Sequence, residues 1–354
     1  MMRNLVGKMV ERARGLTLAG KAMNGRFLLQ KIPRLEPDVI VLDLEMPEMN
    51  GIEFLEARRE RGIDIPVVIL SSVAKRGAKI TMEALSLGAS DFILKPSGSV
   101  SEDIHKVEQQ LVEMLYAYGL DYRRAKGKGT GSGARGEARP EARGEGKGRS
   151  ATGGSPESGT AVGRAGRAGE ARPAAEIPAT GETAPVRPVT PEVSRAEAGD
   201  LEIVAICIST GGPNALRSMF TRFPADFPLP VVVVQHMPAG FTTEFAKSLD
   251  RICPLEVKEA AEGDLLKPGR VLICPGNHHI GVERRRLAGV ARISQKDPVN
   301  GHRPSVDVLF ASVAEHYGGR AMGVIMTGMG LDGAKELGGI LRKGGITVGQ
   351  DRVY

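Results

Sequence analysis

Residues 201–213 read L-E-I-V-A-I-C-I-S-T-G-G-P, a nearly continuous apolar run followed by a serine, a threonine, two glycines and a proline. Such a short apolar run is typical of a strand buried on both faces of a parallel sheet. The two glycines before Pro213 indicate a helix start, because proline at the first helical position loses no intrahelical hydrogen bond. The stretch therefore predicts a strand, a tight turn and a helix, with Ser209 beside the exposed N–H groups of the helix start.

Strand and helix patterns alternate in the same way through both halves of the chain. Strands that stay apolar on both faces and alternate with helices indicate a parallel sheet covered by helices. We therefore predict an α/β protein with two doubly wound parallel sheets. The expected strands lie at 16–19, 38–43, 66–71, 91–95, 201–208, 230–235, 269–274 and 320–327. The expected helices lie near 1–14, 24–32, 51–61, 77–88, 100–116, 213–221, 240–251, 305–317 and 333–343.

The composition changes abruptly near residue 121. Residues 121–200 hold 16 of the 46 glycines and contain no Leu, Met, Phe or Trp. A segment of this kind cannot bury enough apolar surface to offset the entropy of the chain. We predict a disordered linker at 121–200 that joins a first domain, 1–120, to a second, 201–354.

Charge and cysteine usage narrow the class of protein. The segment 121–200 has 14 Lys or Arg against 11 Asp or Glu, so 14 − 11 = +3 of the chain's net charge of +6 lies there. Its charges of both signs are interspersed, which does not favour a nucleic-acid partner. Three cysteines cannot form a complete disulfide framework, which favours a reducing compartment. No run of about 18 apolar residues is present, so we expect no membrane insertion.

Three polar side chains follow strands of the first predicted sheet. Asp43 ends the strand 38–43, Ser71 ends the next one, and Lys95 ends the strand at 91–95. Chemistry in an open α/β sheet gathers outside the carboxyl ends of its strands. A carboxylate flanked by a hydroxyl and an ammonium group suits acyl-phosphate formation, since the latter two neutralise phosphoryl oxygens.

The second domain has a comparable set. Ser209, His236 and Asp332 each follow the carboxyl end of a predicted parallel strand, so one edge of one sheet brings all three within reach of a Ser-His-Asp triad. Singly, each has a plainer interpretation: Ser209 in a phosphate loop or turn, His236 as a structural contact, Asp332 as a helix cap. Cys207 lies in the apolar strand and is expected to pack there.

A zinc site is not expected at residues 274–279. Cys274, His278 and His279 stand close together, but no second ligand pair follows at a suitable spacing. We expect the two histidines to lie in a loop beside the site.

Both domains resemble known families. Residues 1–118, with D-L-E-M-P-E-M-N-G at 43–51, resemble response-regulator receiver domains. Residues 201–354, with S-T-G-G, Q-H-M-P-A-G-F-T and M-T-G-M-G-L-D-G-A, resemble the CheB-type chemotaxis methylesterases. The resemblance implies a flavodoxin-like receiver and a Rossmann-like catalytic domain.

The resemblance also implies an activity and its regulation. It implies that a chemotaxis histidine kinase phosphorylates Asp43, with Ser71 and Lys95 stabilising the phosphoryl group. It implies hydrolysis of glutamate γ-methyl esters, and deamidation of glutamines, on methyl-accepting chemoreceptors, with Ser209, His236 and Asp332 as the catalytic triad. Thr210 and Met329 would shape the site, no cofactor would serve catalysis, and the protein would be a cytoplasmic monomer.

The chain departs from these families at three places. Receivers begin with a strand that ends in an acidic pair, which this chain lacks, so Mg²⁺ would keep Asp43 and Glu45 as partial ligands. Cys207-Ile208 stands where a small Gly-Ala-like pair is usual. The chain also stops short of the closing strand and helix of the methylesterases. We expect that both ends are truncated, and the alternative is a catalytically impaired regulatory or binding protein of a two-component pathway.

Overall fold

The structure of the chain is a computed structural model that describes residues 2–72, 74–96, 101–127, 200–328 and 330–350. Apart from 121–127 and 200, the linker predicted at 121–200 lies outside the described residues. Within the described ranges, no helix is both long and apolar enough to cross a bilayer.

The N-terminal domain contains a parallel sheet in the order β1-β2-β3. Its strands are β1 (Ile40–Asp43), β2 (Val67–Ser71) and β3 (Asp91–Leu94). Its helices are α1 (Met2–Arg12), α2 (Gly25–Leu35), α3 (Gly51–Glu60), α4 (Lys75–Ser86) and α5 (Ser101–Ala125). The expected strand at 16–19 is wrong: Leu16 and Leu18 instead pack, partly buried, against the core that contains Met9 and Leu111.

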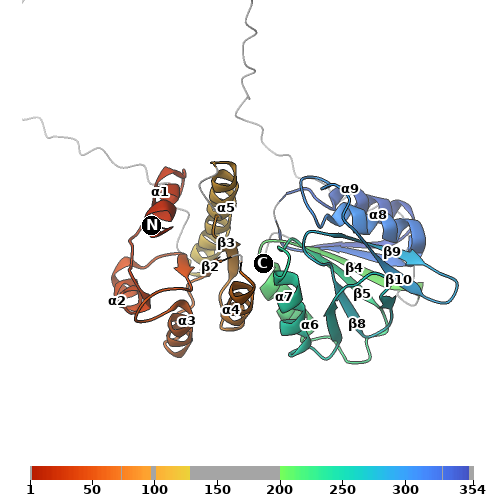
Figure 1. The fold of residues 1–354 in the computed structure, drawn as a ribbon, viewed down its shortest axis with the longest axis horizontal. Coiled ribbons are helices and arrows are strands. Elements are labelled where there is room, and N and C mark those ends of the chain that lie inside the picture. Colours follow the sequence, from red (N-terminus) through yellow and green to blue (C-terminus); the bar gives the residue numbers. More distant parts are fainter. Residues whose placement is uncertain (1, 73, 97–100, 128–199, 329, 351–354) are drawn as a thin grey trace, which may run out of the picture. The chain divides into compact units, whose positions relative to one another are not determined.

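Residues of β2 alternate between two helical layers. Val67 and Ile69 pack in the core that includes side chains of α2, α3 and α4, whereas Val68 and Leu70 pack with α1 and α5. Figure 1 shows α1 and α5 on the opposite side of this sheet from α2 and α3. Side chains of β2 therefore contact helices on both faces of this sheet. The helix α5 runs to Ala125, beyond the expected domain boundary at 120.

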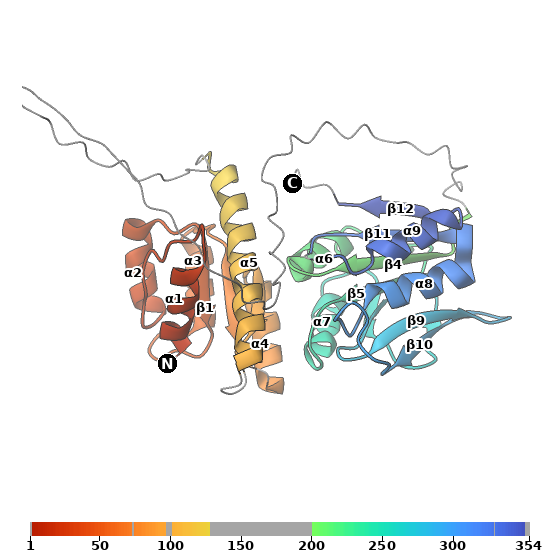
Figure 2. The same cartoon turned by 90° about the horizontal axis from the view of Figure 1, so that it is seen from above.

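The C-terminal domain is built on six parallel strands in the order β12-β11-β4-β5-β8-β6. Figure 2 shows β12, β11 and β4 side by side. The strands are β4 (Ile203–Ile208), β5 (Val231–Gln235), β6 (Glu256–Glu259), β8 (Arg270–Ile273), β11 (Ala321–Ile325) and β12 (Ile346–Gly349). The helices are α6 (Gly212–Phe220), α7 (Phe241–Asp250), α8 (Val306–Tyr317), the 3-10 turn η2 (Gly318–Arg320) and α9 (Ala334–Arg342).

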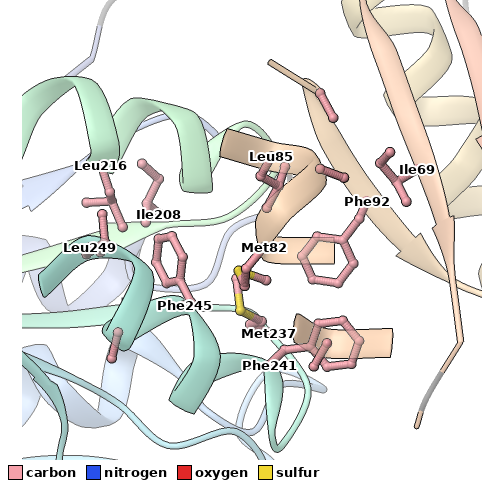
Figure 3. Packing of buried hydrophobic residues seen from close by; sticks show 14 of the residues in the cluster. Ile69, Met82, Leu85, Phe92, Ile208, Leu216, Met237, Phe241, Phe245 and Leu249 are labelled. Atoms are coloured by element: carbon pink, nitrogen blue, oxygen red, sulfur yellow. The ribbon is translucent and has the colours of Figure 1, made fainter. Parts of the chain in front are cut away.

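The strand β4 is buried on both faces. Ile208 packs with Leu216 of α6 and with Phe245 and Leu249 of α7 (Figure 3). Ile206 belongs to the same core. The residues that face the other way along β4, Ile203, Ala205 and Cys207, pack in a second core with side chains of α8 and α9. Each fully buried side chain of this size contributes about 1.5–3 kcal/mol to folding. These contacts fix the position of β4, so Ser209 is the first residue after the buried strand.

A small antiparallel sheet lies outside the sequence-based expectation. It has the order β7-β10-β9 and consists of β7 (Leu265–Leu266), β9 (His279–Arg284) and β10 (Gly289–Ser294). The expectation that both His278 and His279 lie in a loop is therefore wrong for His279, which begins β9 and is buried. The reason is cross-strand pairing, in which His279 lies opposite Ser294, a partner that local sequence does not reveal.

Candidate active site

The turn after β4 presents Ser209. The N–H of Ser209 donates to the carbonyl of Thr327 at 2.9 Å, and its carbonyl accepts the N–H of Gly212 at 2.8 Å. Thr327 also donates its hydroxyl to the carbonyl of Thr210 at 3.0 Å. Gly211 has a φ of 80°, a left-handed conformation that glycine adopts without strain. The loop after β11 therefore holds the turn after β4 through two hydrogen bonds, both made by Thr327.

Gln235, the last residue of β5, supports the same turn from below. Its buried side chain donates to the carbonyl of Ser209 at 3.0 Å. A Cβ atom at Gly212 would collide with Oε1 of Gln235, so a side chain here requires Gln235 to move away from Ser209. The role of Gln235 could not be predicted from the sequence, in which it is only the polar end of an apolar strand.

The structure brings Ser209, His236 and Asp332 together. Nδ1 of His236 lies 3.2 Å from Oγ of Ser209, and Nε2 lies 2.9 Å from Oδ2 of Asp332. An ionised carboxylate only accepts hydrogen bonds, so Nε2 carries the proton and Nδ1 is free to accept one from the serine hydroxyl. In this triad it is thus Nδ1 of the imidazole that faces the nucleophile.

Asp332 is held by more groups than the triad requires. One carboxylate oxygen accepts the Ser305 hydroxyl at 2.7 Å and the Asn300 amide at 2.8 Å, and the other accepts the Val306 N–H at 2.7 Å. Burial would raise the pKa of Asp332, but the hydrogen bonds from His236, Val306, Ser305 and Asn300 outweigh it and hold the pKa well below its ordinary value. The carboxylate is therefore charged at neutral pH.

A tight turn supplies the amide that reaches Asp332. Val299 and His302 pair as an isolated bridge, and the two residues between them, Asn300 and Gly301, have φ values of 55° and 76°. Two positive φ values in a two-residue connection define a type I′ turn, for which Asn-Gly is the favoured sequence. The N-G dipeptide was the available signal for this turn, but it does not indicate which carboxylate the asparagine meets.

His279 supports this loop from β9. Its Nδ1 accepts the N–H of Ser305 at 3.1 Å, and its Nε2 lies 3.1 Å from the carbonyl of Asp297. Both ring nitrogens of the buried histidine are therefore satisfied by backbone groups. His279 fixes Ser305, which in turn donates to Asp332.

Cys207 lies two residues before Ser209 but is chemically quiet. Burial, together with the negative charges of Asp332 and Asp307, raises the pKa of its thiol to about 12. A thiol with such a pKa is protonated at neutral pH and is a poor nucleophile. Cys207 belongs to the same hydrophobic core as Val306 and Leu309 of α8, which agrees with a structural role.

In the N-terminal domain, the structure joins two of the three expected phosphoryl-site residues. Nζ of Lys95 donates to Oδ1 of Asp43 at 2.8 Å. The hydroxyl of Ser71, by contrast, is buried and lies 2.6 Å from Oγ1 of Thr81. Gly51 completes the loop, because a Cβ atom there would lie 2.7 Å from the carbonyl of Asp43.

The expected Mg²⁺ ligands do not by themselves form a complete site. Oδ1 of Asp43 already accepts from Lys95 and from the N–H of Glu45, and the Glu45 carboxylate lies 3.9 Å from the same ammonium. Among the described residues, no group of three or more His, Cys, Asp or Glu side chains could hold a metal ion. These residues do not fit the near-octahedral oxygen shell that Mg²⁺ demands. Met329, expected to shape the esterase site, lies outside the described residues.

The chain is similar to proteins of known families. A family model described as CheB methylesterase matches residues 204–353, and one described as response regulator receiver domain matches residues 1–107. A protein-glutamate methylesterase/protein-glutamine glutaminase of Treponema denticola is 51% identical over 99% of this chain and 86% of its own length. A protein of the same description from Treponema pallidum is 50% identical, over the same shares of the two chains.

The crystal structure of the Thermotoga maritima CheB methylesterase catalytic domain is 40% identical, with a TM-score of 0.42, and covers 43% of this chain and 81% of that one. The T. maritima CheB response regulator domain is 36% identical, with a TM-score of 0.31, over 34% of this chain and 88% of that one. The two family models and the identity over nearly the whole chain place it in one family. The chain belongs to the family of protein-glutamate methylesterase/protein-glutamine glutaminases, which join a response regulator receiver domain to a CheB methylesterase domain.

Proposed function

We propose that this chain is a phosphorylation-regulated serine esterase that hydrolyses glutamate γ-methyl esters on methyl-accepting chemotaxis receptors. The observation that carries this proposal is the continuous line from Ser209 Oγ through the His236 imidazole to the Asp332 carboxylate. The names of the Treponema relatives supply the substrate class.

The geometry supports a two-step acyl transfer. Nδ1 of His236 takes the hydroxyl proton as Oγ of Ser209 forms a bond to the ester carbonyl carbon. The imidazolium then gives this proton to the departing methoxy oxygen, which releases methanol and leaves an acyl-enzyme. Water, deprotonated by the same nitrogen, then attacks the acyl carbon. As the bond to Oγ breaks, the imidazolium returns this proton to Ser209, and the glutamate carboxylate is released. Asp332 remains charged throughout and stabilises the imidazolium.

The developing oxyanion needs N–H donors beside Ser209. We assign this role to the backbone at Thr210, which directly follows the nucleophile and whose carbonyl is fixed by Thr327. Met329, on the loop after β11, is the second residue that we expect to shape this pocket. The same site would deamidate a receptor glutamine, with ammonia in place of methanol as the leaving group.

The N-terminal domain would supply the regulation. We propose Asp43 as phosphoacceptor and a chemotaxis histidine kinase as phosphodonor, with Lys95, already 2.8 Å from Asp43, neutralising a phosphoryl oxygen. Ser71 would take part after its hydroxyl leaves Thr81. We further propose that the protein acts in the cytoplasm as a monomer and binds no nucleic acid.

Methanol release from methylated receptors tests the esterase. We expect Ser209→Ala to abolish turnover, because alanine lacks the hydroxyl that attacks the ester carbon. Ser218→Ala, a matched change at an exposed residue of α6, should leave the rate unaltered. Turnover by Ser209→Ala equal to that of the unmodified chain would refute the proposal.

A further inference from the structure

A second histidine lies flat against the histidine of the triad. The imidazole rings of His236 and His302 are stacked, with centroids 4.2 Å apart and an interplanar angle of 5°. His302 is the last residue of the type I′ turn whose Asn300 reaches Asp332, so one turn contacts two members of the triad. None of the motifs in the sequence pointed to this residue.

The plane of the His236 ring determines whether the triad is connected. The hydrogen bonds of His236 to Ser209 and to Asp332 use the two nitrogens of one ring, so rotation of that ring about the Cβ–Cγ bond lengthens both together. The two bonds hold the nitrogens, whereas the stacked face of His302 opposes tilting of the ring. The backbone bonds between Val299 and His302, at 2.9 and 3.1 Å, keep that face in place.

We propose that His302 is a positioning residue of the esterase, whose imidazole keeps the ring of His236 in the plane that joins Ser209 to Asp332. This inference rests on the proposed function for its substrate, but its geometry concerns only the triad. His302 is not a catalytic residue here, because its contact is with His236.

The protonation state of His302 matters to this role. Burial and the positive charge that His236 can carry lower the pKa of His302, while the carboxylate of Asp332 acts in the opposite direction. Within the described part of the chain, His236 and Asp332 are the titratable groups that act on His302. A neutral His302 leaves its partner free to become an imidazolium during the reaction, whereas a protonated one would repel it.

Two substitutions of His302 distinguish the effect of its flat ring from the effect of its protonation. His302→Ala removes the stacked face, and we expect kcat to fall about 10- to 100-fold with KM changed less than about twofold, as for a small misplacement of a reacting group. His302→Phe restores a flat face that cannot take a proton, and it should recover most of the lost kcat. It should also keep more of its activity than the unmodified chain as the pH falls from 7 to 5.5.

Labelling of Ser209 by a fluorophosphonate probe gives a second measurement that needs no receptor. The labelling rate should be lowest for His302→Ala, and His302→Phe should recover most of the loss. His105→Ala, at an exposed histidine of α5, is the matched control. The inference is wrong if His302→Ala labels at the rate of the unmodified chain, or if His302→Phe loses as much as His302→Ala while both remain folded. Rapid labelling of a chain that releases no methanol would instead overturn the proposed function and leave the role of His302 measurable.

Discussion

The side-chain amide of Asn300 donates to the carboxylate of Asp332 at 2.8 Å, across 32 positions of sequence. The same amide nitrogen lies 2.7 Å from Oδ2 of Asp307, so one neutral group is shared between two buried carboxylates. A neutral donor between two like charges satisfies both without adding a third, and it lets Asp332 stay ionised next to Asp307.

We predict that Asn300→Gly lowers the free energy of unfolding by about 1.5–3 kcal/mol, the usual range for a hydrogen bond to a charged group. Glycine tolerates the φ of 55° at this position, so the loss reports the amide and not the turn. Asn300→Asp should destabilise the chain more, because it places a third carboxylate against Asp332 and Asp307. Urea denaturation of both variants measures the difference, and equal stability of the two would contradict this account.

The depressed pKa of Asp332 predicts how stability depends on pH. An unfolded aspartate titrates near pH 3.9, and the folded carboxyl titrates below that. The contribution of Asp332 is therefore fully present above the unfolded pKa and is lost as the pH falls below it. Asp332→Asn should flatten this part of the stability curve between about pH 5 and 3, measured by thermal unfolding. A variant curve parallel to that of the unmodified chain over this range would be inconsistent with the pairing.

A side chain at Gly212 is predicted to displace Gln235. Its Cβ would meet Oε1 of Gln235, whose amide is held in place by the carbonyl of Ser209. Gly212→Ala should cost about 1–3 kcal/mol of stability, as overpacking does, and should lower the rate of Ser209 labelling by displacing the turn. Gly119→Ala, in α5 with its nearest neighbour at 3.7 Å, is the control and should gain up to about 1 kcal/mol. Similar effects of the two changes would argue against the close contact at Gly212.

Phosphorylation of the N-terminal domain should require Asp43. We expect incubation with radiolabelled acetyl phosphate to place any phosphoryl group on this carboxylate, since Lys95 already lies at its Oδ1. Asp43→Asn should remove the label, while Asp121→Asn, at an exposed residue of α5, should retain it. Undiminished labelling of the Asp43→Asn chain would place the acceptor elsewhere.

Thiol reactivity should separate the cysteines by burial. Cys207 and Cys274 are buried, whereas Cys253 is partly exposed. Burial also raises the pKa of the Cys207 thiol to about 12, which leaves almost no thiolate at neutral pH. Iodoacetamide should therefore alkylate Cys253 first in the folded chain, as peptide mass spectrometry would show. Early modification of Cys207 would mean that β4 opens readily.

The residues at strand ends could be predicted from the sequence, whereas those that support them could not. Ser209, His236 and Asp332 follow apolar runs whose burial makes them recognisable as parallel strands, and such strands end at a common edge. Asn300, His302 and Ser305 lie in the connection between β10 and α8, where no periodicity indicates what a side chain faces. Their contacts depend on how α8, β9 and the loop after β11 pack together, which the local sequence does not indicate.

Local patterns also failed where pairing decides the structure. The run at 16–19 has the composition of a strand, yet its leucines pack against helices. Residues 279–284 alternate weakly, yet they form β9 because β10 lies beside them with a complete register. Strand formation depends on a neighbouring strand as much as on its own sequence.

The two-sided burial of β4 makes the length of this strand as constrained as its composition. Inserting or deleting one residue between Ile203 and Ile208 would exchange the two sets of side chains between the helical layers and turn Ser209 away from His236. Substitutions in β4 should therefore be tolerated only where the new side chain is similar in size to the original one. Mutant libraries made to alter substrate specificity should keep the number of residues in β4 unchanged and vary the loops that follow the strands.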